Sequence, residues 1–310
     1  MSFKILTSGI FTTIQDQGRK GFNHLGITHS GALDEHAYLW SQKLLSNQNS
    51  NALEVMVGLK VEAMKATTIA ITGADLNFKI NGIIQPIWQT QYIKVGDILS
   101  FNKRVSGQRA YLSVKEGFSL EQTYGSYATT LKERIGSKLK RGDILNFQSY
   151  PKIAIQRVQN PYIPNYNEPL TLRLLIGYQD EQFTKEQKEK FFSTEYEITL
   201  QSDRMGFKLK GEAIIPKKGD IISEGIAFGS VQIPKDGQPI LLLKERQTIG
   251  GYPKLGTVLP IDCFKLAQAS LGSMVRFETV TIKKTQRIMC LFYNQYEKVN
   301  NNLSLTLDII

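Results

Sequence analysis

Cysteine and long apolar runs are what this sequence has least of. Its 310 residues include only two cysteines, Cys263 and Cys290, far apart and outside any Cys-x-x-Cys pair. A disulfide framework and a zinc knuckle are therefore not indicated, and both cysteines are expected to be small, buried apolar residues. No apolar run approaches the ~20 residues of a membrane helix, and residues 1–11 have no secretory apolar region. The sequence predicts a cytoplasmic protein that does not enter a membrane.

Sequence motifs for cofactors are missing too. There is no P-loop, no dinucleotide-binding glycine fingerprint and no biotinyl-lysine context of the Met-Lys-Met type. The three histidines, His24, His29 and His36, are spaced five and seven residues apart, which matches neither a helical pair nor a zinc finger. No nucleophile elbow surrounds Ser30, so a serine triad is not indicated. We expect no metal and no covalently bound cofactor.

The chain is basic, with a formal charge of +10 and a pI near 9.4. Basic residues are spread along it, and the one tight cluster lacks the interleaved aromatic side chains of a nucleic-acid reader. This argues against nucleic-acid binding. It leaves two interpretations, a solvated basic face or a site for an anionic small molecule or protein. The cluster comprises Lys132, Arg134, Lys138, Lys140 and Arg141.

Short β-type runs separated by turn residues dominate the chain, which favours closed or nearly closed barrels. The strongest hairpin signal is Asn81-Gly82, because a type I′ turn needs positive φ at both central positions. Helices are fewer, and Asp34 and Asp262 stand where two of them would be capped. Strands are expected at Phe3–Leu6, Thr12–Ile14, Leu53–Val57, Thr68–Ile71, Asn77–Ile80, Tyr111–Val114, Ile144–Phe147, Leu170–Ile176, Glu197–Leu200, Ile240–Leu243 and Met274–Phe277, and helices at Asp34–Leu45, Glu181–Phe192, Asp262–Ala269 and Gln286–Asn300.

A repeated turn indicates an internal duplication. The repeat is a Gly-Asp pair that precedes an apolar strand, with a weaker Gly-Ser copy near the end of the chain. Because two copies precede and two follow the Pro/Asn-rich stretch Asn160–Pro169, this stretch is interpreted as a linker between two similar β-rich domains. The copies are Val95–Phe101, Arg141–Phe147, Lys218–Ile222 and Leu271–Phe277.

The predicted domains follow from this linker. We expect an N-terminal β-barrel domain over residues 1–160 and a C-terminal β-barrel domain over residues 170–285. Residues 286–310 are then a C-terminal tail.

The densest chemistry lies in the loop that runs from Ile14 to Asp34. Its glycines mark places where the backbone needs positive φ or close approach to another group. Between them stand the carboxylates Asp16 and Asp34, the guanidinium of Arg19 and the amide of Gln15. A long glycine-punctuated loop with this inventory is typical of a site. The alternative is a surface loop whose polar groups satisfy its own backbone.

Taken as an ordered set, the motifs of nearly the whole chain resemble one family. This is the biotin-dependent carboxyltransferase family, which includes allophanate hydrolase subunit 2, the carboxyltransferase domain of urea carboxylase and the C-subunit of 5-oxoprolinase (KipA-like). The matching motifs are Gln15-Asp16-Gln17-Gly18-Arg19, Ser30-Gly31-Ala32-Leu33-Asp34, Ala52-Leu53-Glu54, Ile71-Thr72-Gly73-Ala74, Gly107-Gln108-Arg109-Ala110-Tyr111-Leu112, Gly125-Ser126, Gly142-Asp143-Ile144-Leu145, Arg204-Met205-Gly206, Ser223-Glu224-Gly225, Gly229-Ser230-Val231-Gln232-Ile233-Pro234 and Gln247-Thr248-Ile249-Gly250-Gly251-Tyr252-Pro253.

The resemblance implies a mainly β chain with two cyclophilin-like β-barrel domains, a few short helices and an active site in the cleft between the domains. It implies a subunit of a carboxyltransferase-like or ATP-dependent 5-oxoprolinase complex that acts on an amide, lactam or urea-like substrate, with 5-oxoproline to glutamate favoured. Such a subunit would be inactive alone and would work with a KipI-like partner, which supplies or shares carboxybiotin or ATP. The alternative is a KipA-like regulatory protein that sequesters a KipI-like partner.

Two departures from the family pattern leave the substrate open. Tyr127 stands where the family usually has an arginine after Gly-Ser, and Ser137 replaces a second arginine. If the lost arginines hold an anionic group, Lys138 or Arg141 replaces the charge but not the bidentate geometry. The loss favours the regulatory alternative.

Carboxyl transfer to an amide-like nitrogen requires a carboxylate clamp, donors for the developing oxyanion and a base. Arg19 is our candidate for the clamp, because its fork of N–H donors matches a carboxylate; the alternative is a structural ion pair with Asp16 or Asp34. The predicted catalytic set is completed by Tyr252 and comprises Asp16, Arg19, Asp34 and Tyr252. The alternative for Tyr252 is an aromatic side chain that only packs against its neighbours.

The predicted substrate-binding residues are amides and glycines. Gln15, Gln232 and Gln247 would orient an amide or ureido group through neutral hydrogen bonds. Gly250 and Gly251 would let backbone N–H groups approach the substrate, and the alternative is a tight barrel-corner turn. We expect Asp16, Arg19 and Asp34 to face Gln232, Gln247 and the Gly-Gly-Tyr turn.

Overall fold

The structure is a computed structural model that describes residues 2–48 and 50–298. The described chain consists mainly of short strands, which confirms the mainly β fold expected from the sequence. It divides into two compact units, and each has its own hydrophobic core. Unit 1 comprises Met1–Gly18, Asp34–Tyr166 and Met289–Ile310, and unit 2 comprises Arg19–Leu33 and Asn167–Ile288.

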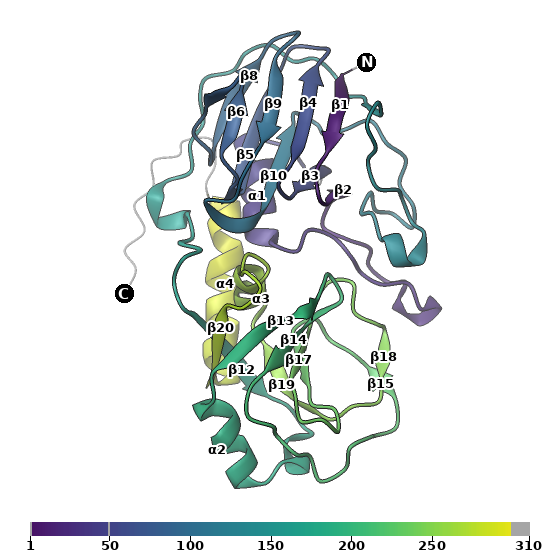
Figure 1. Cartoon of the computed structure of the whole chain (residues 1–310), viewed down its shortest axis with the longest axis vertical. Helices are drawn as coiled ribbons and strands as arrows, with labels where there is room; N and C mark the ends of the chain where they lie inside the picture. Colours follow the sequence, from purple (N-terminus) through teal and green to yellow (C-terminus); the bar gives the residue numbers. More distant parts are fainter. Residues whose placement is uncertain (1, 49, 299–310) are drawn as a thin grey trace. The chain divides into compact units, whose positions relative to one another are not determined.

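Unit 1 is built from two antiparallel sheets (Figure 1). The strand order is β11-β1-β4-β9-β6-β7 in the six-stranded sheet and β2-β3-β10-β5-β8 in the five-stranded sheet. The strands are β1 (Phe3–Ser8), β2 (Thr12–Gln15), β3 (Ala52–Val55), β4 (Leu59–Ala63), β5 (Thr67–Asp75), β6 (Phe78–Ile80), β7 (Ile83–Ile84), β8 (Gln89–Ile93), β9 (Ile98–Phe101), β10 (Ser106–Val114) and β11 (Ile144–Leu145).

Alternation along the strands of unit 1 sends every second side chain into the core. In β1, Phe3 and Ile5 are fully buried whereas Lys4 between them is exposed, the pattern of a strand with one face on the core. Phe3 packs edge-on against Phe147, with ring centroids 4.8 Å apart. The same core takes Ile69 and other apolar residues from both sheets.

The first helix of unit 1, α1 (Glu35–Leu44), packs against β5, β8 and β10. Its N-cap is Asp34, as predicted, because the Asp34 Oδ1 accepts the backbone N–H of Ala37 at 3.0 Å. The Thr72 hydroxyl of β5 donates to the Ala37 carbonyl at 2.7 Å, and the Trp40 side chain is fully buried. The helix is therefore fixed to the five-stranded sheet by hydrogen bonds as well as by apolar packing.

Seven strands of unit 2 form a closed barrel in the order β12-β19-β16-β17-β14-β13-β20 (Figure 1). The barrel closes through the parallel pairing of β12 with β20. A separate two-stranded sheet pairs β15 (Glu224–Gly225) with β18 (Ile249–Gly250) and is not part of the barrel. The barrel strands are β12 (Leu170–Ile176), β13 (Tyr196–Ser202), β14 (Gly206–Lys210), β16 (Ser230–Gln232), β17 (Ile240–Leu242), β19 (Lys254–Val258) and β20 (Met274–Thr279).

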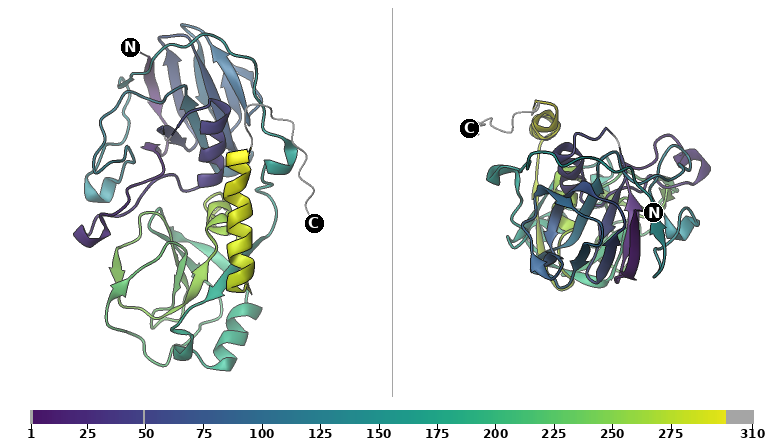
Figure 2. Two further views of the ribbon diagram at one scale, coloured as in Figure 1. Left: turned by 180° about the vertical axis from the view of Figure 1, so that it is seen from behind. Right: turned by 90° about the horizontal axis from the view of Figure 1, so that it is seen from above.

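The helices of unit 2 begin at other residues than predicted. The segment expected as Glu181–Phe192 begins with a 3-10 turn, and α2 (Lys185–Ser193) starts only after Thr184, whose hydroxyl accepts the N–H of Gln187. Phe191 of α2 packs on Phe277 of β20 with ring centroids 4.5 Å apart, which places the helix against the barrel (Figure 2).

The predicted N-cap Asp262 is also wrong. Helix α3 (Pro260–Leu266) begins two residues earlier, where a proline at its first position needs no N–H partner. The Asp262 carboxylate instead accepts the Arg173 backbone N–H and Nε, both at 2.9 Å, and Nη2 at 2.6 Å. The last helix, α4, runs from Ile282 to Lys298, so residues 299 and 300 of its predicted range lie outside the described residues.

The cysteines differ from each other, contrary to the prediction that both are buried. Cys263 of α3 is fully buried, and burial raises its pKa, which keeps the thiol protonated and unreactive. Cys290 is exposed on α4.

Three of the four proposed repeats have the same turn. The Asp97 and Asp143 N–H groups and the Ser273 N–H each donate to the carbonyl three residues earlier, all at 3.1 Å. In each turn the preceding glycine has a positive φ, and its N–H bonds to a carbonyl outside the turn. The copy at Lys218–Ile222 is different, because Asp220 pairs with Lys235 and residues 221–223 directly after it are not in a strand.

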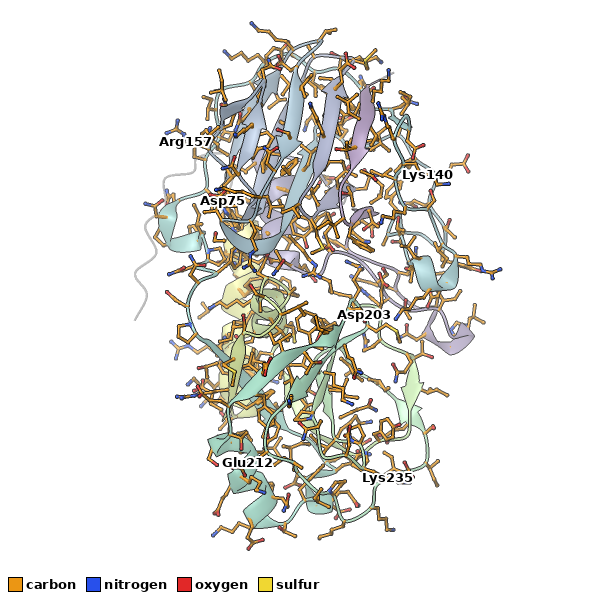
Figure 3. The ribbon with its side chains drawn as sticks, in the orientation of Figure 1. Asp75, Lys140, Arg157, Asp203, Glu212 and Lys235 are labelled. Atoms are coloured by element: carbon orange, nitrogen blue, oxygen red, sulfur yellow. The ribbon has the colours of Figure 1, made fainter. Side chains whose placement is uncertain are left out.

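The turn predicted at Asn81-Gly82 is present, and two aspartate turns that were not predicted also occur. In the β6–β7 hairpin Asn81 and Gly82 have φ values of 51° and 81°, which confirms the type I′ turn. Asp75 at the end of β5 and Asp203 after β13 each accept the N–H of the residue two positions later, at 2.8 and 2.7 Å (Figure 3).

The unit boundaries differ from the predicted domain boundaries in two places. Residues 19–33 belong to unit 2, where the N–H of Ser30 donates to the Lys244 carbonyl at 3.0 Å. Residues 289–298, predicted to be a tail, belong to unit 1, where the Tyr296 hydroxyl lies 2.6 Å from His36 Nδ1. The change from Tyr166 to Asn167 falls inside the stretch interpreted as a linker.

Two glycines with positive φ should respond differently to alanine. Gly142 has φ 93° and open space at its Cβ position, so Gly142→Ala should cost only backbone strain, about 1–2 kcal/mol of unfolding free energy. Gly73 has φ 83°, and a Cβ there would clash with the Arg109 carbonyl of β10. Gly73→Ala should therefore cost a further ~1–3 kcal/mol. Urea denaturation of both variants checks this, and equal costs would contradict it.

Candidate functional site

Asp16 holds a loop of unit 1 in place. Its Oδ1 accepts hydrogen bonds from the Gly18 N–H at 2.8 Å and from the Ser126 hydroxyl at 2.7 Å, and its Oδ2 accepts the Tyr127 N–H at 2.7 Å. Only 7% of Asp16 is exposed. Both carboxylate oxygens are engaged by the protein itself, and this favours a structural role for Asp16. Tyr127 contributes its backbone, so this bond is independent of the side chain at position 127.

Asp34 lies in a buried polar network. Its Oδ2 accepts the Tyr166 hydroxyl at 2.8 Å, and its backbone N–H donates to the Tyr111 hydroxyl at 2.8 Å. Tyr111 in turn donates to Glu54 Oε2 at 2.8 Å, and Glu54 Oε1 lies 3.5 Å from Arg109 Nε. Burial raises the pKa of Tyr111 well above its usual value, and the Glu54 carboxylate adds to this effect. The tyrosine hydroxyl therefore stays protonated and able to donate.

Gln15 and Arg19 are buried as well. Gln15 is fully buried, and its Nε2 donates to the Thr13 hydroxyl at 3.0 Å and to the Thr129 carbonyl at 3.1 Å. Arg19 is 1% exposed, and its backbone N–H donates to the His29 carbonyl at 2.7 Å. Truncation of either side chain would disturb packing, so neither residue gives a clean test of ligand contact.

Ser30 fastens the 19–33 segment within unit 2. Its hydroxyl donates to Glu245 Oε1 at 3.3 Å, and the same carboxylate forms a buried ion pair with Arg204. Arg204 Nη2 also donates to the Gly31 carbonyl at 2.6 Å. Ser30 has a φ of 51°, which a residue with a side chain rarely adopts and which these contacts hold in place. The geometry gives Ser30 a structural role.

Two cations, Lys244 and Arg246, flank Glu245 in the sequence. Lys244 is 5% exposed, and its ammonium lies 5.0 and 5.7 Å from the ring centroids of Phe228 and Phe264, a cation–π arrangement. Burial lowers the pKa of Arg246 to about 10, so it remains charged at neutral pH, and its Nε donates to the Ile226 carbonyl at 2.9 Å. Neither cation was among the residues predicted from the sequence.

The accessible predicted residues lie together on unit 2. Gln247 is exposed, Tyr252 is 38% exposed, and Gly250 and Gly251 between them are half-buried. The Gly251 carbonyl accepts the Ile221 N–H at 2.8 Å, which joins the turn to the segment that leads into β15. We call Gln247, Gly250, Gly251 and Tyr252 the Gly-Gly-Tyr rim.

Gln232 supports this rim from the inside. It is 1% exposed on β16, and its Nε2 has no hydrogen-bond partner among the described residues. A Cβ at Gly250 would lie 2.9 Å from this nitrogen and 2.6 Å from Ile226 Cδ1. The turn therefore packs closely on the Gln232 amide, which lies beneath the rim and not on its surface.

Three residues that were not predicted connect the rim to the barrel. Lys254, at the start of β19, forms an ion pair with Glu224 of β15. Gln179 Nε2 donates to Glu224 Oε1 at 2.7 Å, and Gln179 Oε1 accepts the Lys254 N–H at 2.8 Å. Burial acts to raise the pKa of Glu224, but hydrogen bonds from Lys254, Tyr178 and Gln179 outweigh it and lower the pKa. The sequence feature that could have indicated Lys254 is a cation at the first position of a short apolar strand.

The predicted site residues thus fall into two groups. The buried residues form hydrogen bonds within loops or at a helix end. The accessible residues form the neutral Gly-Gly-Tyr rim, with the Gln232 amide beneath it. That the N-terminal charged residues face the rim stays a prediction. The buried group is Gln15, Asp16, Arg19 and Asp34, and the rim group is Gln247, Gly250, Gly251 and Tyr252, with Gln232 below.

Metal ligands do not gather anywhere in residues 2–48 and 50–298. Within these ranges no three His, Cys, Asp or Glu side chains come together as a metal site would require. No helix in the same ranges has the length and apolar character needed to span a membrane.

Comparison with known proteins places the chain in a family. Residues 25–279 match the family described as carboxyltransferase domain, subdomain A and B. The chain is 32% identical to the C-subunit of 5-oxoprolinase from Escherichia coli over 290 residues, which covers 91% of this chain and 92% of the relative. The chain therefore belongs to the carboxyltransferase-domain family, and the resemblance inferred from its motifs is confirmed.

More distant relatives are larger. Urea amidolyase of Saccharomyces cerevisiae is 26% identical over 318 residues, and the match covers 93% of this chain but 17% of that protein. The crystal structure of Kluyveromyces lactis urea carboxylase superposes with a TM-score of 0.89 at 22% identity, over 99% of this chain and 30% of that one. The second likeness shows that the fold is shared.

Removing the Asp16 carboxylate should loosen the loop that it holds. Asp16→Ala leaves three donors without their acceptor, so the unfolding free energy should fall by about 1.5–3 kcal/mol. Asp75→Ala is the matched control, because that carboxylate accepts one N–H in a turn and should cost less. Urea denaturation measures both, and an Asp16→Ala cost no greater than the control would rule out the structural role.

The Glu224 ion pair should contribute to stability in a defined pH range. Its pKa is lower in the folded protein than the ordinary value of about 4.3, so the contribution is fully present above that value. It is lost as the pH falls through the lowered folded-state pKa. The stability difference between the wild type and Glu224→Gln should shrink across this acidic range in urea titrations, and a difference independent of pH would contradict the assignment.

Proposed function

We propose that this chain is a subunit of a carboxyltransferase-like or ATP-dependent 5-oxoprolinase complex that binds an amide, lactam or urea-like substrate. The observation that carries the proposal is the accessible Gly-Gly-Tyr rim. Its side-chain groups, the Gln247 amide and the Tyr252 phenol, are neutral and can both donate and accept hydrogen bonds. A neutral amide or lactam has one carbonyl acceptor and N–H donors, which such groups match without burying an unpaired charge.

Conversion of 5-oxoproline to glutamate is the favoured reaction. The bacterial relatives that match over nearly their whole length are 5-oxoprolinase subunits, which supports this choice. 5-Oxoproline also carries a carboxylate. The buried cations Arg204 and Lys244 and the half-buried Arg246 outnumber the Glu245 carboxylate that precedes Gln247 by two residues, and this excess of positive charge favours an anionic ligand.

The proposed complex needs further components. A KipI-like subunit is the proposed partner, with a further hydrolase component for 5-oxoprolinase activity. Carboxybiotin or ATP is supplied by or shared with that partner, in line with the absence of nucleotide motifs in this sequence. Within this scheme the present chain binds and orients the amide group, and it is inactive alone.

Reconstitution tests the proposal. The purified chain is mixed with its KipI-like partner, the hydrolase component and ATP, and loss of 5-oxoproline and formation of glutamate are followed by mass spectrometry. Turnover that requires this chain supports the proposal. Complex formation without turnover of 5-oxoproline or urea, together with inhibition of the partner, supports the regulatory alternative, which the missing arginines at Tyr127 and Ser137 favour. No binding and no turnover would contradict both.

Tyr252→Phe should weaken substrate binding without affecting the fold. It removes one neutral hydrogen bond, worth about 0.5–1.5 kcal/mol, so KM should rise roughly two- to tenfold. The residue is 38% exposed, so the unfolding free energy should not change. Tyr92→Phe on β8 of unit 1 serves as the matched control. A KM that stays at the wild-type value for Tyr252→Phe in the active complex would remove Tyr252 from the site.

A further inference from the structure

The rim is attached to unit 2 by a sheet that is too small to be stable alone. Strands β15 and β18 have two residues each, and they pair with each other outside the closed barrel. A two-stranded pair of this length does not persist in water without other contacts. Contacts of its side chains must therefore fix its position.

The strongest of these contacts is the ion pair between Lys254 and Glu224. The Lys254 side chain is 11% exposed and that of Glu224 30%, so the pair is shielded from solvent on the lysine side. Gln179 bonds to both members, to the Glu224 carboxylate through Nε2 and to the Lys254 backbone through Oε1. A charged pair that is partly desolvated and doubly hydrogen-bonded has a defined geometry, unlike an isolated surface pair.

The position of this ion pair in the chain restricts the conformation of the Gly-Gly-Tyr turn. Glu224 lies directly opposite Gly250 in the β15–β18 pairing, and Lys254 follows Tyr252 by two residues. The ion pair therefore closes a short loop that begins at Gly250 and ends at Lys254, with Gly251 and Tyr252 inside it. Lys254 itself is held in the barrel by pairing of β19 with Gln232 of β16.

A second support comes from inside the barrel. The buried Gln232 amide packs closely against Gly250, where a Cβ would lie 2.9 Å from its Nε2. The Ile221 N–H bond to the Gly251 carbonyl joins the two segments of the ribbon to each other and does not reach the barrel. The packing on Gln232 limits how far the turn can move inward. Outward movement is opposed by the ion pair, because it ties Glu224 of β15 to a residue of the barrel.

We propose that Lys254 and Glu224 are positioning residues that fix the Gly-Gly-Tyr rim in its ligand-binding conformation. The identity of the ligand rests on the proposed function, whereas the attachment of the rim does not. When the pair is broken, the ribbon of residues 221–226 and 247–252 separates from the barrel, and Tyr252 and Gln247 lose their fixed geometry.

Hydrogen exchange tests the attachment without any substrate. Lys254→Met removes the charge and keeps most of the apolar stem. Amide exchange in peptides that cover residues 221–226 and 247–252 should become about tenfold faster, with no change in β12 and β17. The matched control is Lys208→Met, which breaks the exposed pair with Asp236 at 2.9 Å in the same unit and should leave both ribbon peptides unchanged. Unchanged exchange in Lys254→Met would overturn the proposal.

Two further variants keep the test decisive if Lys254→Met does not fold. Glu224→Gln keeps the side-chain volume and one acceptor oxygen. Amide exchange in the two ribbon peptides should therefore become faster, but by less than in Lys254→Met. Lys254→Arg restores the charge, and its exchange should return to within about twofold of the wild type. An Arg variant that behaves like the Met variant would show that packing, not the ion pair, fixes the ribbon.

Kinetics of the reconstituted complex tests the link to ligand binding. KM should rise about tenfold in Lys254→Met while kcat changes little, because the rim is misplaced in the free protein and ligand binding has to restore it. Faster exchange with an unchanged KM would overturn the positioning role. If the wild-type complex shows no turnover, the proposed function fails, and the exchange experiment still decides whether the ion pair holds the rim.

Discussion

A buried carboxylate has to be saturated with hydrogen-bond donors, and this constraint fixes much of the structure. An ionised carboxylate in the interior without donors costs far more than folding can supply, so each one recruits N–H or O–H groups from elsewhere in the chain. Asp16 draws in the loop at Ser126, Asp34 connects α1 to Tyr166, and Asp262 binds Arg173. The acidic residues of this protein thus act as fixing points for loops and helices. The groups left accessible at the Gly-Gly-Tyr rim are neutral.

Local sequence patterns were enough to predict most of the fold. Each strand expected from the sequence overlaps an observed strand, and the turn at Asn81-Gly82 has the predicted dihedral angles, because alternation and turn chemistry depend on neighbours in sequence. Among the missed strands, β4, β8, β14, β16 and β19 mix apolar residues with lysine, glutamine or glycine, and long-range pairing overrides their weak propensity. The cap at Asp262 failed for the same reason. Arg173, 89 residues away, competes for the carboxylate.

The site was less predictable than the fold. Sequence reasoning selected candidate motifs but could not decide which of their polar residues are accessible, since the hydrogen bonds that bury a polar group come from distant partners. Asp16 meets Ser126 across 110 residues, and Asp34 meets Tyr166 across 132. Gln179 and Lys254, which meet across 75 residues, lie in separate segments with no local sign of contact. The structure leaves Gln247 and Tyr252 exposed and Gly250 and Gly251 half-buried, and their role in a site stays a prediction.

Both units are assembled from segments that are far apart in the chain, and this has a consequence for biosynthesis. Unit 2 takes Arg19–Leu33 from near the start and extends to Ile288, whereas unit 1 takes residues from Met289 onward. A ribosome releases the chain from its N-terminus, so the contacts of unit 2 are not complete until Ile288 has emerged, and those of unit 1 need residues from Met289 onward. Each unit therefore completes its folding only after its later segment has been synthesised. A gene fragment that encodes only residues 167–288 would leave Lys244 and Arg204 without the segment that Ser30 and Gly31 bring to them.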